Sequence, residues 1–201
     1  MPHVQMPVPT ELRTSRLVLR PWRAEDADEL LPILEANLEH LGPWIPARVS
    51  TPVPLPQLAE RLAGFNREFA EAREWRYGMF ATDDGRILGE VGLYPRSDTS
   101  RAAYADATCV ELGYWLGADA TGQGLVTEAS RLLLAEAAKL PHISHVEIRC
   151  DARNAASAAI PKRLGFTLAS SVARDTSDGN GTVQMQIWTR DIASLGSLAP
   201  S

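Results

Sequence analysis

The first half of the chain alternates between apolar runs of strand length and apolar positions at helical spacing. Residues 17–19 predict a short strand that stops at Pro21, whose missing backbone donor interrupts a sheet ladder. The acidic residues that follow indicate the first turn of a helix, because carboxylates stabilise the positive end of the helix dipole. A second helix is predicted over 58–69, and the proline-rich stretch 40–56 between the helices is interpreted as an ordered loop.

The second half of the chain is dominated by strand patterns with two helices between them. Further strands are predicted over residues 77–82, 86–94, 109–116, 145–150, 168–173 and 183–189. An Asp-Asp-Gly turn joins the first two of these into an antiparallel hairpin, and a turn at 178–181 joins the last two. Helices are predicted over 125–140 and 154–164.

This order of elements predicts an α+β fold with three layers. Strands come in runs with only two helical crossovers late in the chain, so we expect a mixed, mostly antiparallel central sheet of about seven strands with helices on both faces. The folded unit is expected to be a single domain over 12–192, with flexible tails at 1–11 and 193–201.

Composition and charge narrow the classes of function. The chain has 201 residues, of which 45% are hydrophobic, and this suits one domain with a full core. Its net charge is -5 and its basic residues are scattered, so neither a nucleic acid nor a membrane is expected as a partner. A cationic partner suits this charge better. The start of the chain has no leader pattern, and no stretch approaches the length of a membrane span, so a cytoplasmic location is expected.

The cysteines and histidines give no sign of a metal site. Cys109 and Cys150 each lie in an apolar run, where a reduced, buried thiol is the usual state. His40, His142 and His145 share no ligand spacing and are not near a Cys pair, so no metal is expected.

The segment 111–134 carries the strongest sign of chemistry. A predicted strand ends at Leu116, a loop with Gly117, Gly122 and Gly124 follows, and a helix begins at about Leu125. The first NH groups of a helix have no partner within the helix, and glycines let an anion approach them closely. This pattern indicates a site for a phosphate or pyrophosphate, although a plain strand-to-helix turn has the same glycines.

Two other phosphate-binding motifs fit the segment less well. A P-loop requires a lysine directly after the last glycine, and none follows Gly124. A dinucleotide fingerprint requires a third glycine where the chain has Thr127, and it opens a strand–turn–helix unit, whereas several antiparallel strands come first here.

At this point the sequence resembles a known family. ELGYWLGADATGQGLVTEA, followed by NAASAAIPKRLGF over 154–166, is similar to the GNAT superfamily of acyl-CoA-dependent N-acetyltransferases. The residues around Tyr114 and the Leu-Gly-Phe that ends the second motif resemble the RimJ/RimL branch, known for acetylating ribosomal-protein N-termini. Residues 17–22 and 40–46 also fit that branch. One departure is Asp119, which stands where the family often has Arg or Gln and is not expected to contact phosphate.

The resemblance implies a fold and a cofactor. The sheet should splay between its fourth and fifth strands, and the pantetheine arm of acetyl-CoA should lie there against the main chain of Trp115 and Leu116, with Asn154 as a further contact. The remaining residues assigned to the cofactor are Gly117, Gly122, Gln123, Gly124, Leu125, Val126 and Thr127. Independently of the resemblance, Asn154 is placed to cap the following helix, and the two roles are compatible.

Acetylation requires a base, because only a neutral amine attacks and a primary aliphatic amine has a pKa of about 10. Glu111 is the candidate, since partial burial between Val110 and Leu112 would make it a stronger base. A solvent-facing strand glutamate is the alternative interpretation. Glu90, on the neighbouring hairpin strand, is the reserve base and a candidate acceptor contact.

The departing thiolate needs a proton or a hydrogen bond. Many family members use a tyrosine of the late helix, but residues 154–166 contain none. The resemblance assigns the role to Ser157 instead, with Tyr104 and Tyr114 as fallbacks. Trp44 is assigned to the amine pocket.

The identity of the acceptor stays open. A ribosomal-protein N-terminus, a polyamine, an amino acid and an amine antibiotic are all compatible with the sequence, and a cationic acceptor would suit the acidic chain. The alternative function is a non-catalytic acyl-CoA-binding module. The missing tyrosine of the late helix and the departure at Asp119 favour this alternative. The resemblance leaves a homodimer open as well.

Overall fold

The structure is a computed structural model that describes residues 7–97, 100–175 and 181–197. Within these residues one sheet runs in the order β1-β2-β3-β4-β6-β7-β9-β8, and β5 pairs with β4. The strands are β1 (Leu12–Arg13), β2 (Leu17–Pro21), β3 (Trp75–Ala81), β4 (Ile87–Ser97), β5 (Ser100–Arg101), β6 (Cys109–Leu116), β7 (His145–Asp151), β8 (Thr167–Asp175) and β9 (Thr182–Asp191). All seven predicted strands are present, and β1 and β5 add two short ones.

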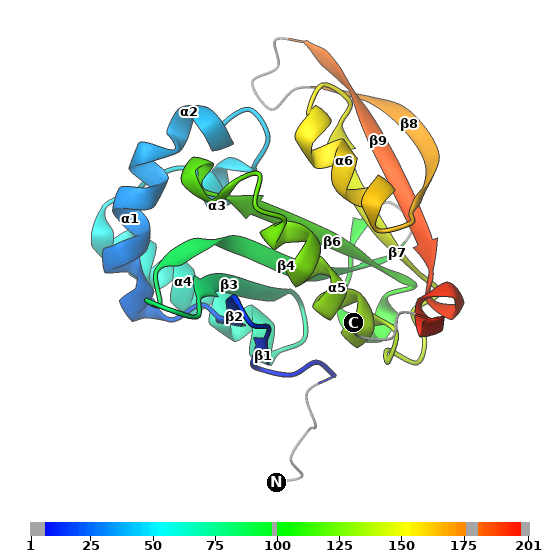
Figure 1. Cartoon of the computed structure of the whole chain (residues 1–201), viewed down its shortest axis with the longest axis horizontal. Coiled ribbons are helices and arrows are strands. Elements are labelled where there is room, and N and C mark those ends of the chain that lie inside the picture. The colour runs from blue at the N-terminus through cyan, green and yellow to red at the C-terminus, as the bar shows by residue number, and fades with distance from the viewer. Residues whose placement is uncertain (1–6, 98–99, 176–180, 198–201) are drawn as a thin grey trace, which may run out of the picture.

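Helices cover both faces of the sheet, as the sequence predicts (Figure 1). They are α1 (Ala27–Ala36), α2 (Leu38–Leu41), α3 (Ala47–Ser50), α4 (Leu55–Ala70), α5 (Leu125–Ala137) and α6 (Ala155–Arg163). Short 3-10 helices lie at Ala24–Asp26, Tyr104–Asp106, Ala118–Ala120 and Ile192–Ser197.

The structure corrects the expectation of an ordered loop over 40–56. This stretch contains the end of α2, all of α3 and the start of α4. Pro46 and Pro54 stand directly before α3 and α4, and Pro56 is at the second position of α4. Proline is tolerated at such helix starts because its missing NH would have no partner there. The prolines therefore begin helices in this stretch instead of excluding them.

Each face of the sheet packs against its own hydrophobic cluster. On one face, Trp22, Phe80 and Trp115 pack with the apolar residues of α1 and α4, and we call this the α4 face. On the other, the apolar face of α5 packs against Leu112 and other strand residues, and we call this the α5 face. Successive residues of a strand point to opposite faces, so the direction of each side chain follows from its position.

Both ends of the described chain take part in packing. Val8 and Leu195 are almost fully buried, and both belong to the cluster on the α5 face. The hydroxyl of Tyr77 donates a hydrogen bond to the carbonyl oxygen of Pro9 at 2.7 Å. The packed unit therefore extends a few residues beyond 12–192 at each end, which corrects the expected tails in those positions. The expected turn at 178–181 falls largely outside the described residues.

The sheet divides between β6 and β7. β6 pairs antiparallel with β4 along its whole length, from Arg96↔Cys109 to Gly89↔Leu116. Its parallel pairing with β7 runs only from Cys109↔His145 to Glu111↔Glu147. Beyond these residues the two strands separate, as Figure 1 shows, and we call this point the fork. The expected splay of the sheet is thus confirmed.

Beyond the fork, the end of β6 lies very close to β4. A Cβ added to Gly89 on β4 would overlap the carbonyl oxygen of Trp115 and lie 2.9 Å from the Cα of Leu116. Only glycine allows β4 and β6 to pair at this distance. The position of the last two residues of β6, which border the fork, therefore depends on Gly89.

Candidate active site

The loop between β6 and α5 ends in two glycines with left-handed backbone. Gly122 has φ of 75° and Gly124 has φ of 77°, conformations that other residues adopt only with strain. No atom lies within 4 Å of a Cβ added at either position, so the backbone is bordered by open space. Helix α5 begins at Leu125 directly after Gly124, and its first NH groups have no partner within the helix. The arrangement offers free amides at the positive end of a helix dipole.

Side chains around this loop hold it in place. Arg16 donates to the main-chain oxygen of Gln123 at 3.0 Å and forms an ion pair with Glu128. The side chain of Gln123 donates to the main-chain oxygen of Asp119 at 3.2 Å. Asp119 is exposed and lies 3.6 Å from Arg86. Gln123 is thus oriented by the loop itself.

For two residues assigned to the cofactor, the structure shows that one polar group is already bonded or is buried. The NH of Gly117 donates to Leu88 at 2.9 Å and extends the pairing between β6 and β4. The hydroxyl oxygen of Thr127 is buried and has no hydrogen-bond partner among the described residues. An anion at the start of α5 would therefore meet the main chain of Thr127, because its hydroxyl is turned inward.

The edge of β6 beside the fork is open to a ligand. Past Glu111 the main chain of β6 has no strand partner on its β7 side within the described residues. The side chains of Trp115 and Leu116 are buried, one on each face of the sheet. An extended ligand is able to bind such an edge as an added strand would.

Helix α6 and strand β6 each bring one hydroxyl group to the fork on the α5 face. Asn154 caps the helix, since its side-chain oxygen accepts from the NH of Ser157 at 3.0 Å. The hydroxyl of Tyr114 lies 3.1 Å from the main-chain oxygen of Ser157 and 3.3 Å from its Oγ. Burial raises the pKa of Tyr114, so its hydroxyl stays protonated. Tyr114, the second choice from the sequence for the partner of the thiolate, is thus a direct neighbour of Ser157.

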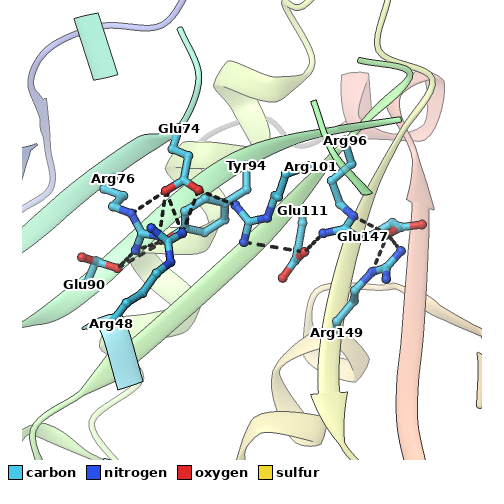
Figure 2. A network of polar contacts seen from close by, with 10 residues as sticks. All are labelled: Arg48, Glu74, Arg76, Glu90, Tyr94, Arg96, Arg101, Glu111, Glu147 and Arg149. Atoms are coloured by element: carbon cyan, nitrogen blue, oxygen red, sulfur yellow. Dashed lines mark hydrogen bonds and ion pairs between the residues drawn. The ribbon is translucent and has the colours of Figure 1, made fainter. Parts of the chain in front are cut away.

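The α4 face carries a network of ion pairs that ends at the fork (Figure 2). At its inner end Glu90 is almost fully buried and both its oxygens are occupied. It accepts from Trp22 and Arg76 at 2.7 Å each and from Tyr94 at 3.2 Å. These contacts correct the expectation that Glu90 meets the acceptor or serves as a reserve base, because its carboxylate is buried among protein donors.

Glu74 forms the centre of the network. Its carboxylate lies 2.8 Å from Arg48, 2.8 Å from Arg76 and 3.3 Å from Arg101. Burial alone would raise the pKa of Glu74, but the three guanidinium groups together hold it below its usual value. Glu74 therefore stays ionised and anchors arginines that come from three different elements.

Glu111 lies at the outer end of the network, beside the fork. Its carboxylate is 2.8 Å from Arg96 and 3.9 Å from Arg101. Figure 2 shows it between β6 and β7 where the two ribbons separate. Glu111 and Glu147 thus form the last pair of β6 and β7 before the fork, and the oxygens of Glu111 are shared with arginines.

Trp44 extends from the segment between α2 and α3 and is 39% exposed. Its ring centroid lies 6.0 Å from the guanidinium carbon of Arg153, which precedes α6 and pairs with Asp151 at 2.7 Å. The contact joins the segment between α2 and α3 to the turn between β7 and α6. The assignment of Trp44 to the amine pocket stays a prediction.

The parallel pairing of β6 and β7 creates a ligand-type cluster that the sequence spacing did not reveal. Cys109, His145 and Glu147 each offer an atom, and these three atoms lie within 4.8 Å of one another. However, the Glu147 carboxylate is 2.7 Å from Arg149 and 4.0 Å from Arg96, and these positive charges oppose a cation. We therefore assign the cluster to the ion network.

Comparison with known proteins identifies the family. Residues 16–167 match the model of the acetyltransferase (GNAT) domain, which covers most of the chain. The chain belongs to the GNAT acetyltransferases, and it is an acetyltransferase with the fold of that family.

Individual relatives have similar lengths. The chain is 27% identical over 166 residues to YdaF of Bacillus subtilis, covering 82% of this chain and 85% of the relative. It is 28% identical over 155 residues to the ribosomal protein uS5-alanine N-acetyltransferase of Escherichia coli, covering 77% of each. It superposes with a TM-score of 0.74 and 18% identity on RimL, a ribosomal alpha-N-protein acetyltransferase in complex with coenzyme A, covering 92% of this chain and 97% of RimL. Among the described residues, no helix has the length and apolar character needed to cross a bilayer.

Proposed function

We propose that the protein transfers the acetyl group of acetyl-CoA to a primary amine, by direct attack in a ternary complex. The fork carries this proposal, since an open strand edge leads there to free amides at the start of a helix. A protein N-terminal α-amine is the favoured acceptor, because two of the relatives above are named for acetylating ribosomal proteins. A small-molecule amine is the remaining alternative.

The cofactor would lie along main-chain groups of the glycine loop and of the β6 edge. The pyrophosphate would accept hydrogen bonds from the amides of Gly124, Leu125 and Val126. The dipole of α5 would stabilise its negative charge. The pantetheine arm would follow the open edge of β6 at Trp115 and Leu116. Bound acetyl-CoA supplies the thioester carbon that the amine attacks.

Residues of the chain then assist two steps: the amine loses a proton, and the departing thiolate receives a proton or a hydrogen bond. Glu111, beside the fork, accepts the amine proton directly or through a water molecule. The new C–N bond forms as the C–S bond breaks, and the leaving thiolate receives a hydrogen bond or proton from Ser157. The hydroxyl of Tyr114, 3.3 Å from Ser157 Oγ, holds that serine in place.

The test separates the enzyme from a binding module with the same cleft. Acetyl-CoA is titrated into the purified protein by calorimetry, and release of free CoA is then followed with a panel of peptides and small amines. Binding together with amine-dependent release supports the proposal. Binding without release over the whole panel would assign the chain to a non-catalytic acyl-CoA-binding module.

We expect Gly124→Val to weaken acetyl-CoA binding by about tenfold or more, because valine at φ of 77° costs about 1–3 kcal/mol in strain and displaces the adjacent amides. Calorimetry measures the dissociation constant. The matched control is Gly165→Val, which has φ of 72° at the far end of α6 and should lose similar stability with no change in affinity. Equal affinities of the two variants for acetyl-CoA would contradict the proposal that this loop binds the pyrophosphate.

Tyr114 and Ser157 should act as a unit in thiolate release. Ser157→Ala is expected to lower kcat by about tenfold, and Tyr114→Phe by somewhat less, with acetyl-CoA affinity retained. The double variant should lose little beyond Ser157→Ala, because residues of one hydrogen-bonded group are not additive. Fully additive losses would show that Tyr114 does not work through Ser157.

A further inference from the structure

The network on the α4 face differs in charge from the chain as a whole. The chain carries a net charge of -5, whereas the network pairs five arginines with four glutamates and so keeps one positive charge. Its members are Arg48, Arg76, Arg96, Arg101, Arg149, Glu74, Glu90, Glu111 and Glu147. The net charge of this network is therefore opposite in sign to that of the whole chain.

The acids of this network are covered and two of its cations are exposed. The side chains of Glu74 and Glu111 are 12% and 16% exposed. The side chains of Arg48 and Arg101 are 51% and 40% exposed. A molecule that approaches this surface meets guanidinium groups before it meets carboxylates.

Arg101 lies beside Glu111 at the fork, and Arg48 joins the network through Glu74. Ser157 and Tyr114 reach the fork from the α5 face, whereas Glu111 and its arginines lie on the α4 face, so an amine that uses Glu111 as its base would approach from the α4 face. Arg101 lies on that face with its guanidinium carbon 4.0 Å from the ring centroid of Tyr94 and one nitrogen 3.9 Å from Glu111 (Figure 2). Arg48 belongs to α3, a short helix that follows Trp44.

We infer that the acceptor carries a carboxylate close to its reacting amine, as in a peptide whose N-terminal residue is followed by an acidic residue. This inference rests on the proposed function and defines its substrate class. Arg101 and Arg48 would attract the carboxylate while Glu111 faces the amine, so that the two charges of the acceptor meet opposite charges. It replaces the cationic acceptor that the overall charge favours.

The test uses three peptides that begin Ala-Glu, Ala-Gln and Ala-Arg and are otherwise identical. With saturating acetyl-CoA, kcat/KM is expected to fall in that order, with about a tenfold ratio between the acidic and the basic peptide at low salt. The ratio should shrink at 0.5 M salt, where exposed charges are screened within a few ångströms. A ratio that is flat or favours arginine overturns the inference.

Charge variants assign the preference to the two arginines. Arg101→Gln and Arg48→Gln should each lower the acidic-to-basic ratio by about threefold or more. Arg48→Lys keeps the charge and should keep most of the ratio, which a merely structural role would not predict. Arg13→Gln is the matched control, because Arg13 is 60% exposed on β1 at the opposite end of the sheet. A ratio that moves equally in Arg13→Gln would contradict the assignment.

The outcomes for the inference and for the proposed function are distinct. Acetylation of all three peptides without an acidic preference overturns the inference and leaves the proposed function standing. Binding of acetyl-CoA with no acetylation of any amine overturns the proposed function, and the inference with it.

Discussion

Replacing Glu111 by glutamine is expected to lower kcat by about 10² or more, with the dissociation constant of acetyl-CoA nearly unchanged. Glutamine keeps the shape of the side chain but cannot take a proton from the amine, and such loss of acid–base catalysis typically costs about 10² to 10⁴. The carboxylate belongs to β6, the strand whose open edge is proposed to bind acetyl-CoA, at the last paired position before the fork. Steady-state kinetics and calorimetry measure the two quantities.

The control for Glu111→Gln is Glu147→Gln, the paired residue on β7, whose carboxylate also contacts Arg96. Both variants remove one charge from the network, so a general loss of structure would affect them alike. Only Glu111→Gln should lower kcat strongly. If kcat is unchanged, the proton passes to water without this carboxylate, and the proposed role of Glu111 is wrong.

Replacing Arg76 by methionine is expected to lower the free energy of unfolding by about 3–5 kcal/mol. Arg76 is 3% exposed and bridges Glu74 and Glu90 at 2.8 and 2.7 Å. Without it the buried carboxylate of Glu90 loses its guanidinium partner, and removing one partner of a buried pair typically costs this amount. Urea unfolding of both proteins gives the difference.

Arg13→Met serves as the comparison, because Arg13 pairs with Glu11 on the surface, where both side chains are about half exposed. An exposed pair contributes about 1 kcal/mol or less. A loss of that size in Arg76→Met would mean that water or protonation compensates the buried carboxylates. The network would then be a weaker support of the sheet than its burial indicates.

Local patterns predicted most of the fold. The strand at 109–116 and the start of α5 at Leu125 agree with the structure to the residue, because both depend on signals within a few positions. The short helices α2 and α3 were missed, since four-residue helices have too few positions to show a period. The prolines at the starts of α3 and α4 pointed to a loop instead.

The site was predictable where it is contiguous and was missed where it is assembled from distant strands. The glycine loop and Asn154 are read directly from their neighbours in sequence. The contact of Arg101 with Glu74 spans 27 positions and that of Trp22 with Glu90 spans 68. No periodicity records such pairs, so the burial of Glu90 and the exposure of Arg101 required the three-dimensional arrangement of the strands.

Gly89 gives the sheet a constraint that reaches beyond its own strand. Because an added methyl group there would overlap the carbonyl oxygen of Trp115, any larger residue must push β6 away from β4. The shift would move the open edge of β6 toward β7 and narrow the space between the two strands. The width available to a ligand is thus limited by a residue that no ligand would touch, and tolerance to substitution at position 89 should be as low as in the site itself.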